Sequence, residues 1–503
     1  MRTLSKSRLI AHRQCAKRLW LEVNRPHLKN ESGATQALYA GGHEVGDLAR
    51  ALYDPRGEGV LIDAQSEGYA SALERSAALL EGYAPLFEAG YQAKGAIFFA
   101  DVMERETRGD VDGWRIVEVK STGGVKDYHR DDAAIQAYVA RQAGVALTSI
   151  ALAHIDTDWV YRGDGDYRGL LREVDLTEEA FAASERVAGW IADAQDTLAR
   201  SDEPEIRWSR HCSKPYDCGF IDHCRTSEPE VAAPSHWLPD VRKAALKSAI
   251  HEDLVRGMDD IPDSLLNPLQ LRVKHHTLSG TRHFDQAAAA AALEGLGTPA
   301  SFLDFETIMF AIPIWAGTRP FAHVPFQFSL HVVSDGGHID HTGFLELSGD
   351  NPSRMLAEAL VGACPSEGPV FAYYASFEKG VIETLADAYA DLEADLRAIA
   401  SRLVDLLPVA KAYFYDPSQR GSWSIKKVLP AVAPDLSYGA LEGVQDGGMA
   451  MAAYMEAIEP TTEPARRAEI SEQLDRYCAL DTFAMIRLWE YLRGAPASEP
   501  RGA

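Results

Sequence analysis

Two acidic side chains stand two residues apart in the apolar run Phe302-Leu303-Asp304-Phe305-Glu306-Thr307. Because the side chains of a strand alternate between its faces, Asp304 and Glu306 share one face, while Leu303 and Phe305 anchor the other. Two carboxylates on one face repel each other unless a cation lies between them. The pattern therefore indicates a divalent-metal site and metal-assisted hydrolysis. A solvated pair of acids on a half-exposed strand is the alternative that this fragment alone leaves open.

A second acidic centre is expected where two neighbouring strands meet. The run Ala96–Val102 reads as a buried strand that leads to Asp101 near its end. After a polar turn, Trp114–Ser121 alternates so that Glu118 and Lys120 share one face. The carboxylates suit Mg²⁺ or Mn²⁺, and the ammonium group suits an attacking water or the charge of a pentavalent phosphate. The alternative is a cross-strand salt bridge on a wet face of the sheet.

The six cysteines lie at positions 15, 212, 218, 224, 364 and 478. In a reducing compartment, the even spacing of Cys212, Cys218 and Cys224 points to metal or cluster ligation rather than to disulfides. Cys15, in a basic amphipathic helix pattern over residues 7–22, is the natural fourth ligand. Four thiolates suit a tetrahedral zinc ion or an iron–sulfur cluster, and the lack of a Cys-x-x-Cys pair favours iron–sulfur. Unligated buried thiols are the alternative.

Length and composition bound the class of protein. A chain of 503 residues exceeds what one hydrophobic core usually supports, so at least two domains are expected. Residues 1–14 lack the apolar core of a secretory signal, and no apolar run is long enough to span a bilayer, so we expect a cytoplasmic protein with no membrane partner. The net charge of −24 argues mildly against a nonspecific polyanion binder, although residues 1–25 carry seven basic residues against one acid.

The N-terminal centre resembles the PD-(D/E)XK nuclease core of RecB-like exonucleases. The resemblance rests on Asp101, on Glu118-Val119-Lys120 and on Gln136-Ala137-Tyr138. It implies that Gln136 and Tyr138, on a predicted helix, contact nucleic acid near the metal. The run Ile-Phe-Phe-Ala before Asp101 departs from the glycine-rich turn that is usual in the family.

The same resemblance covers roughly residues 1–225 and implies the roles of further residues. It implies that His43, in a Gly-His-Glu-Val-Gly run, joins Asp101 and Glu118 as metal ligands, and that Lys120 is catalytic together with the two acids. One cysteine before the core and three after it is similar to RecB-like nucleases that hold a [4Fe-4S] cluster, including the CRISPR-associated exonucleases. The four clustered cysteines would therefore hold such a cluster, with zinc as the alternative.

Residues 300–495 are similar to DnaQ-like 3′–5′ exonucleases, which have the ribonuclease H-like fold. Asp304 and Glu306 match the first motif of that family, and the third is Tyr477-Cys478-Ala479-Leu480-Asp481, on a helix expected over residues 468–492. Tyr477 and Asp481 are four residues apart and therefore share one helical face. The resemblance implies that Asp304, Glu306 and Asp481 hold a pair of metal ions and that Tyr477 positions the attacking water.

The second motif of that family corresponds to Val370–Glu378, a predicted strand that turns into a helix. The family usually has aspartate at the metal-binding position, and this chain offers Glu378. Asp405, at the end of another predicted strand, is a competing acid. We take Glu378 as the fourth metal ligand, and Asp405 stays open as the alternative.

The chain is thus expected to be an α/β protein with a restriction-endonuclease-like PD-(D/E)XK domain over residues 1–225, a helical linker region over 226–299 and a ribonuclease H-like exonuclease domain over 300–495. This order resembles bacterial proteins in which an iron–sulfur RecB-like nuclease is joined to a DnaQ-like exonuclease. The expected function is metal-dependent hydrolysis of DNA, at single-stranded ends, in DNA repair or defence. An RNA-directed exonuclease and a catalytically decayed nucleic-acid-binding scaffold are the alternatives.

Overall fold

The computed structural model describes residues 2–30, 33–227, 230–252 and 255–499, with the side chains of residues 33–40 excepted. The chain divides into two compact units. Unit 1 comprises Met1–Pro229 and Phe310–Phe321, and unit 2 comprises Glu230–Met309 and Ala322–Ala503. Both units combine helices with a mixed sheet, which confirms the α/β class. Within the described ranges, no helix has the length and apolar character needed to cross a membrane.

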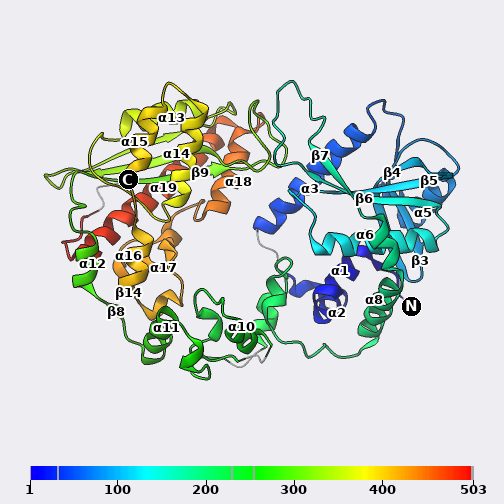
Figure 1. Ribbon diagram of the computed structural model, residues 1–503, viewed down its shortest axis with the longest axis horizontal. Helices are drawn as coiled ribbons and strands as arrows, with labels where there is room; N and C mark the ends of the chain where they lie inside the picture. Colours follow the sequence, from blue (N-terminus) through cyan, green and yellow to red (C-terminus); the bar gives the residue numbers. More distant parts are fainter. Residues whose placement is uncertain (1, 31–32, 228–229, 253–254, 500–503) are drawn as a thin grey trace. The chain divides into compact units, whose positions relative to one another are not determined.

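Unit 1 is built on a seven-stranded sheet in the order β2-β3-β4-β5-β6-β7, with β1 paired to β4 (Figure 1). The strands are β1 (Leu4–Ser5), β2 (Val60–Leu61), β3 (Leu86–Ala93), β4 (Ala96–Arg108), β5 (Val111–Lys120), β6 (Leu147–Ile155) and β7 (Leu171–Asp175). The first residues of β4 pair with β3 on one side and with β1 on the other. β1 therefore lies on the same side of β4 as β5. Leu4 and Ser5 therefore lie beside the end of β5, where Lys120 lies.

Helices cover both faces of this sheet. They are α1 (Lys6–Gln14), α2 (Ala16–Asn24), α3 (Gly33–Tyr53), α4 (Ala64–Glu67), α5 (Tyr69–Leu79), α6 (Asp127–Gln142), α7 (Thr177–Ala182), α8 (Ser184–Ala199) and α9 (Ile221–Thr226). The main core lies between the sheet and α6, with Trp114 and Ile116 of β5 packed against Ala133 and Ala137 of α6 and its neighbours. The face of β5 that carries Ile116 also carries Glu118, so α6 covers the candidate site.

Unit 2 contains a five-stranded sheet in the order β11-β10-β9-β12-β13. The strands are β9 (Ala300–Ile308), β10 (Val324–Val333), β11 (Ile339–Leu345), β12 (Val370–Ala372) and β13 (Leu403–Asp405). β9 is antiparallel to β10 and parallel to β12, and β12 is parallel to β13. A separate pair, β8 (His283–Phe284) with β14 (Phe414–Tyr415), ties the region expected to be a linker into this unit.

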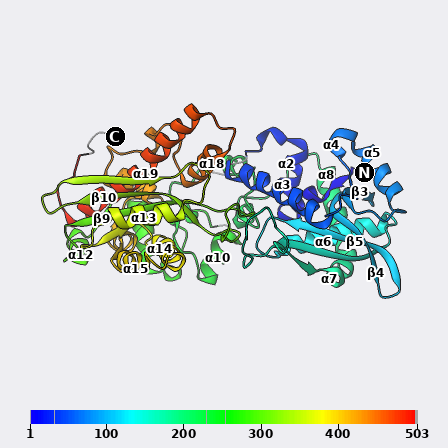
Figure 2. The same ribbon diagram turned by 90° about the horizontal axis from the view of Figure 1, so that it is seen from above.

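The helices of unit 2 include some on each face of its sheet. They are α10 (Ala244–His251), α11 (Pro268–Ser279), α12 (Gln286–Ala292), α13 (Ser353–Ala363), α14 (Ser376–Ala388), α15 (Glu393–Ser401), α16 (Leu406–Tyr413), α17 (Ile425–Val432), α18 (Gly447–Ile458) and α19 (Pro464–Arg493). Leu303 and Phe305 of β9 pack with Phe328 and Leu330 of β10 against α13, α14 and α15. Figure 2 shows α19 on the other side of β9 and β10 from α14 and α15. The alternation of β9 therefore turns its two acids toward α19.

A buried histidine helps to join α19 to the sheet. His331 Nδ1 lies 2.7 Å from Thr482 Oγ1, and the imidazole packs against that of His341, with 4.4 Å between ring centroids. Burial, followed by the neighbouring His341, lowers the pKa of His331 to about 3. Thr482 also bonds Ser329 Oγ at 2.7 Å. Because Thr482 follows Asp481, this network fixes the helix at the candidate site.

Acidification is expected to weaken this contact. Between the ordinary histidine pKa near 6.5 and a value of about 3, the unfolded chain binds a proton that the folded chain does not, so stability falls as the pH falls through this range. We expect His331→Gln to remove about 3 kcal/mol of that loss between pH 7 and pH 4. Urea unfolding of both proteins at pH 7, 5 and 4 measures the difference, and parallel pH profiles would contradict the assignment.

Candidate active sites

Unit 2 brings three acidic side chains together in the layer between β9 and α19. Ligand oxygens of Asp304, Glu306 and Asp481 all lie within 4.8 Å of one another, and in the described part of the chain this is the one group of three or more ligands that could hold a metal ion. Asp304 and Glu306 come from one face of β9, and Asp481 lies one turn after Tyr477 on α19, as their spacing predicts. We call these three residues the acidic triad.

Burial and mutual repulsion make the acidic triad unfavourable without a cation. Burial raises the pKa of Asp304 well above its usual range, and the neighbouring carboxylates raise it further. Burial, followed by Asp481, raises the pKa of Glu306 to about 8. Burial also raises the pKa of Asp481 to about 6. A divalent ion bound by the three oxygens would compensate these charges.

Two tyrosines and a lysine surround the acidic triad. The Tyr438 hydroxyl donates to Asp481 Oδ1 at 2.5 Å, and Lys426 Nζ donates to the Tyr477 hydroxyl at 3.2 Å. Lys426 Nζ also donates to the carbonyl of Gln445 at 2.9 Å. Burial, followed by the charge of Asp481, raises the pKa of both tyrosines well above the usual range, so both stay protonated at neutral pH. Tyr477 can therefore orient a bound group by hydrogen bonding but does not act as a phenolate base.

The surroundings of Glu378 and Asp405 differ in a way that favours Glu378 as a further ligand. Glu378 is 3% exposed, and its Oε2 is buried with no hydrogen-bond partner. Burial raises its pKa to about 8, and its charge in turn acts on Asp304. Asp405 Oδ1 instead accepts from the backbone amides of Leu407 at 2.9 Å and Tyr374 at 3.0 Å, which caps α16. A buried, unpaired carboxylate oxygen beside other acids is what a cation would satisfy.

Unit 1 aligns three carboxylates across three neighbouring strands. Glu88 lies between Phe87 and Ala89, which pair with Val102 and Ala100 on either side of Asp101, and Glu118 follows Val117, which pairs with Val102. Opposed residues of antiparallel strands project to the same face, so the three form a row. Asp101 Oδ2 accepts from the backbone amide of Val119 at 2.7 Å, which fixes its rotamer in the middle of the row.

Two ammonium groups meet at one oxygen of Glu118. Lys6 Nζ and Lys120 Nζ each lie 2.5 Å from Glu118 Oε1. On α6, Asp132 lies 2.8 Å from Lys120 and 3.5 Å from Lys6. Gln136 Nε2 donates to Glu118 Oε2 at 2.6 Å and to Asp132 Oδ1 at 3.0 Å. Glu118, which is 1% exposed, is therefore held by donors on both of its oxygens.

The charges of this cluster are unequally compensated. Although burial opposes it, Lys120 and Lys6 hold the pKa of Asp132 well below its usual range. Burial lowers the pKa of Lys120, but the charges of Asp132 and Glu118 raise it. The result is a pKa well above the usual range of lysine. In contrast, burial together with Glu118 raises the pKa of Asp101 to about 8. The two lysines thus compensate the charge of Asp132 but not that of Asp101.

The other residues expected at this site differ in their positions. Gln136 is fully buried and donates hydrogen bonds to the carboxylates of Glu118 and Asp132. It therefore positions these side chains and does not present an exposed amide. Tyr138, two residues later on α6, is half-buried and packs against the main core of unit 1. His43 is exposed on α3, and its charge contributes to the pKa of Glu88, which burial raises. The structure therefore brings Gln136 to the acids and His43 near them, whereas Tyr138 packs into the core.

The four clustered cysteines of unit 1 are all free and largely buried. Cys212, Cys218 and Cys224 form one apolar cluster with Trp20, Leu21 and Phe220. Burial and, with smaller effects, Cys212, Cys218 and Cys15 raise the pKa of Cys224 to about 11. No three of the four sulfurs lie within 4.8 Å of one another. The thiols offer the ligand type that a thiolate-binding cluster needs, but at a wider spacing than the oxygens of the acidic triad.

The single helix expected over residues 7–22 is wrong. Cys15 has an extended backbone (φ −163°, ψ 123°) that ends α1 and precedes α2. Its amide still donates to the carbonyl of Ala11 at 2.9 Å, so the break leaves that donor paired. Gln14 anchors the break, because its Nε2 donates to the carbonyls of His211 at 2.8 Å and Tyr216 at 2.7 Å. Contacts with a segment about 200 residues away in the sequence therefore override the local helical pattern.

Sequence reasoning missed five residues that contact or face these sites: Lys6, Glu88, Asp132, Lys426 and Tyr438. One signal was available for Asp132, which precedes Gln136 by four residues and so shares its helical face. Lys6 was visible only as part of a basic N-terminus. The others come from segments whose pairing with the sites depends on the tertiary fold.

Comparison with known protein families gives one match. Residues 301–424 match the family model described as Domain of unknown function (DUF2779). The matched range contains Asp304, Glu306 and Glu378 and ends before Asp481. A comparison with curated proteins finds no match.

Proposed function

We propose that the protein is a divalent-metal-dependent nuclease that hydrolyses DNA through two separate sites, one in each unit. The observation that carries the proposal is the convergence of Asp304, Glu306 and Asp481 within 4.8 Å in a largely buried layer. Like charges with raised pKa values are costly to a fold, and such groups concentrate where chemistry is done. We assign unit 2 to the ribonuclease H-like, DnaQ-like exonucleases and unit 1 to the RecB-like PD-(D/E)XK nucleases on the motifs given above.

In unit 2, the acidic triad and Glu378 would hold Mg²⁺ or Mn²⁺. The donor set fits because the oxygens of the acidic triad lie within 4.8 Å of one another, and the buried Glu378 Oε2 has no hydrogen-bond partner. The ions would neutralise charge on the attacking and leaving oxygens of the phosphodiester. Tyr438 holds Asp481 through its hydroxyl, and Lys426 holds the Tyr477 hydroxyl, which orients the attacking water.

In unit 1, Asp101, Glu118 and His43 would hold the metal. The raised pKa of Asp101 supports this, because it identifies the carboxylate without a compensating cation. Lys120 has two carboxylate partners that keep it charged, so it is suited to stabilising negative charge on the phosphate. Gln136 supports the site by fixing Glu118 and Asp132.

Digestion of labelled single-stranded DNA and RNA of one sequence tests the proposal. We expect the full-length protein to degrade DNA with Mg²⁺ or Mn²⁺ and not with excess chelator. Faster degradation of RNA would change the substrate class to RNA. Absence of divalent-dependent cleavage of either strand would favour the nucleic-acid-binding scaffold instead.

We further propose that Cys15, Cys212, Cys218 and Cys224 hold a [4Fe-4S] cluster, with a structural zinc ion as the alternative. Four buried, unpaired thiols that raise one another's pKa support this, because thiolate ligation would remove that penalty. The cluster would join the N-terminal helices to a segment about 200 residues later. Closing so long a loop is expected to stabilise unit 1.

Removing one thiol tests this centre. We expect Cys218→Ser to lose the brown colour and most of the iron of anaerobically purified protein, and to lower the free energy of unfolding of unit 1 by about 3 kcal/mol or more, because ligation energy is also folding energy. Cys364→Ser is the matched control, since Cys364 is equally buried but lies in unit 2. A colourless native protein that contains zinc would show that the site holds zinc and not a [4Fe-4S] cluster. Iron retained in Cys218→Ser would show that Cys218 is not a ligand of the cluster.

A further inference from the structure

A lysine lies beside the acidic triad without forming an ion pair with it. Lys426 is in the first turn of α17, and its Nζ donates to the carbonyl of Gln445 at 2.9 Å and to the Tyr477 hydroxyl at 3.2 Å. In the described part of the chain, these two uncharged acceptors are its hydrogen-bond partners. Since an ammonium group has three N–H donors, one stays available for a further acceptor.

The charge of Lys426 nevertheless acts on the whole acidic triad. Burial raises the pKa of each of the three carboxyl groups, and the charge of Lys426 opposes that rise in all of them. The lysines of unit 1 are arranged differently, because Lys120 contacts Glu118 directly at 2.5 Å. A lysine that only balanced buried charge would be expected to pair with a carboxylate in the same way.

Two aromatic rings keep the ammonium group at this position. Lys426 Nζ lies 4.9 Å from the ring centroid of Tyr477 and 5.0 Å from that of Tyr438, within the range of cation–π attraction. The Tyr438 hydroxyl reaches on to Asp481, and Tyr477 precedes Asp481 by one turn of α19. The two rings therefore hold the ammonium group close to the acidic triad without a direct contact.

The segment before α18 relates Lys426 to a second member of the acidic triad. Gln445, whose carbonyl accepts from Lys426, lies two residues before Gly447, the first residue of α18. A Cβ added to Gly447 would lie 3.9 Å from Glu306 Oε2. The segment 445–447 therefore connects the ammonium group to the Glu306 side of the acidic triad.

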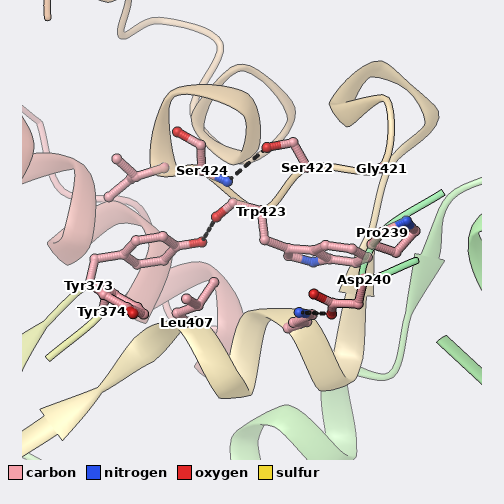
Figure 3. A pocket seen from close by; sticks show the side chains of 11 residues that line it. Pro239, Asp240, Tyr373, Tyr374, Leu407, Gly421, Ser422, Trp423 and Ser424 are labelled. Atoms are coloured by element: carbon pink, nitrogen blue, oxygen red, sulfur yellow. Dashed lines mark hydrogen bonds and ion pairs between the residues drawn. The ribbon is translucent and has the colours of Figure 1, made fainter. Parts of the chain in front are cut away.

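The start of α17 is fixed by hydrogen bonds of the segment that precedes it. Figure 3 shows this segment, in which the carbonyl of Trp423 accepts from the Tyr373 hydroxyl at 2.5 Å. The indole of Trp423 is buried, and its Nε1 donates to the carbonyl of Phe414 at 2.9 Å. Lys426 is therefore placed in advance, as a group that stabilises developing charge must be.

We propose that Lys426 is a catalytic residue of unit 2, whose remaining N–H donates to a non-bridging oxygen of the scissile phosphate. This inference rests on the proposed function of unit 2. During hydrolysis, a bond forms between phosphorus and the water oxygen, and the bond between phosphorus and the leaving oxygen breaks. One proton of the water passes through solvent to the leaving oxygen, and Lys426 keeps its own protons. Its charge stabilises the negative charge on the non-bridging oxygens, next to the proposed metal site.

This position predicts opposite effects of Lys426 on cleavage and on metal binding, because its charge attracts the phosphate but repels a cation at the acidic triad. We expect Lys426→Met to slow single-turnover cleavage of single-stranded DNA about 10²–10³-fold and to bind Mn²⁺ at least as tightly as its parent. Both are measured on the full-length protein in an Asp101→Asn background, which removes a proposed metal ligand of unit 1. Methionine keeps the apolar stem between the two rings. Lys427→Met, at the next and exposed residue, is the matched control.

Two further variants distinguish direct action on the phosphate from other roles. Lys426→Gln keeps a donor for the carbonyl of Gln445 but has no charge, so it should be as slow as Lys426→Met. Tyr477→Phe removes the hydroxyl that Lys426 contacts. If Lys426 acts on the phosphate itself, Lys426→Met should still slow cleavage about 10²-fold in the Tyr477→Phe background.

The outcomes separate this role from the proposed function. Cleavage that Lys426→Met leaves unchanged, or that excess Mn²⁺ restores, overturns the catalytic role and leaves the nuclease intact. The role is also overturned if Lys426→Met has no further effect in Tyr477→Phe, because Lys426 then only positions Tyr477, or if Lys426→Gln cleaves at nearly the parent rate, because its charge is then not needed. Absence of divalent-dependent cleavage by the Asp101→Asn parent overturns the proposed function of unit 2 and this role with it.

Discussion

Asp304→Asn is expected to lower divalent-dependent cleavage by unit 2 about 10³-fold and to make the metal-free protein more stable. Asp304 contributes one of the three oxygens of the acidic triad, and burial and its neighbours raise its pKa well above the usual range. Asparagine keeps the shape of the side chain but removes the charge. The loss of a metal ligand weakens binding of the ion, whose charge stabilises the transition state of the reaction. The same loss relieves repulsion with Glu306 and Asp481, for a gain of about 1–3 kcal/mol in chelator.

The opposite signs of these two effects make the prediction specific. Cleavage is measured in a Lys120→Ala background so that unit 1 does not contribute, and stability is measured by urea unfolding with chelator. Asp340→Asn is the control, because Asp340 lies on β11 of the same sheet but is exposed and pairs with His338. Undiminished cleavage would remove Asp304 from the site. Lower stability in chelator would mean that the carboxylate has a structural partner instead of a cation.

The parts of the candidate sites that follow from local periodicity were accessible from the sequence. The two-residue repeat of β9 turns Asp304 and Glu306 to one face, and the four-residue step on α19 brings Asp481 to the same layer as Tyr477. The alternation of β5 likewise turns Glu118 toward α6. In each case the periodicity of one regular strand or helix sets the direction of the side chain, so the contacts of distant segments are not needed to predict it.

The remaining parts depend on contacts between distant segments. Lys6 reaches Glu118 only because the two-residue strand β1 pairs with β4, and so short a strand has no pattern of its own. The chain breaks a locally favourable helix at Cys15, because the adjacent Gln14 bonds His211, about 200 residues later in the sequence. The segment Phe310–Phe321 follows β9 of unit 2 but packs in unit 1, with Ile312 and Phe321 against Val45 and Leu170. The hydrophobic periodicity of the sequence does not predict such contacts between distant segments.

The second large effect is expected at Lys120 of unit 1. In an Asp304→Asn background, which silences unit 2, Lys120→Ala should lower divalent-dependent cleavage of single-stranded DNA by about 10²–10⁴-fold. The reason is that the ammonium lies 2.5 Å from Glu118 and 2.8 Å from Asp132, at the point where the row of acids meets α6. Lys94→Ala, on the exposed β3–β4 turn, is the control and should keep full activity. Cleavage by the double variant at the rate of Asp304→Asn alone would show that Lys120 is not catalytic.

Lys6 complicates this test, and an arginine series resolves it. Both lysines neutralise Glu118, so removing either one leaves a buried carboxylate short of a partner and should lower the free energy of unfolding by about 3 kcal/mol. Arginine restores the charge but not the compact shape of an ammonium group. If Lys6 only balances charge, Lys6→Arg should recover both stability and cleavage. Lys120→Arg should recover stability alone and stay at least about 10²-fold slow, because the position of its donor on the phosphate decides the rate. Equal recovery of cleavage by both arginine variants would mean that Lys120, like Lys6, acts only as a counterion and that the chemistry of unit 1 lies with Asp101 and its metal.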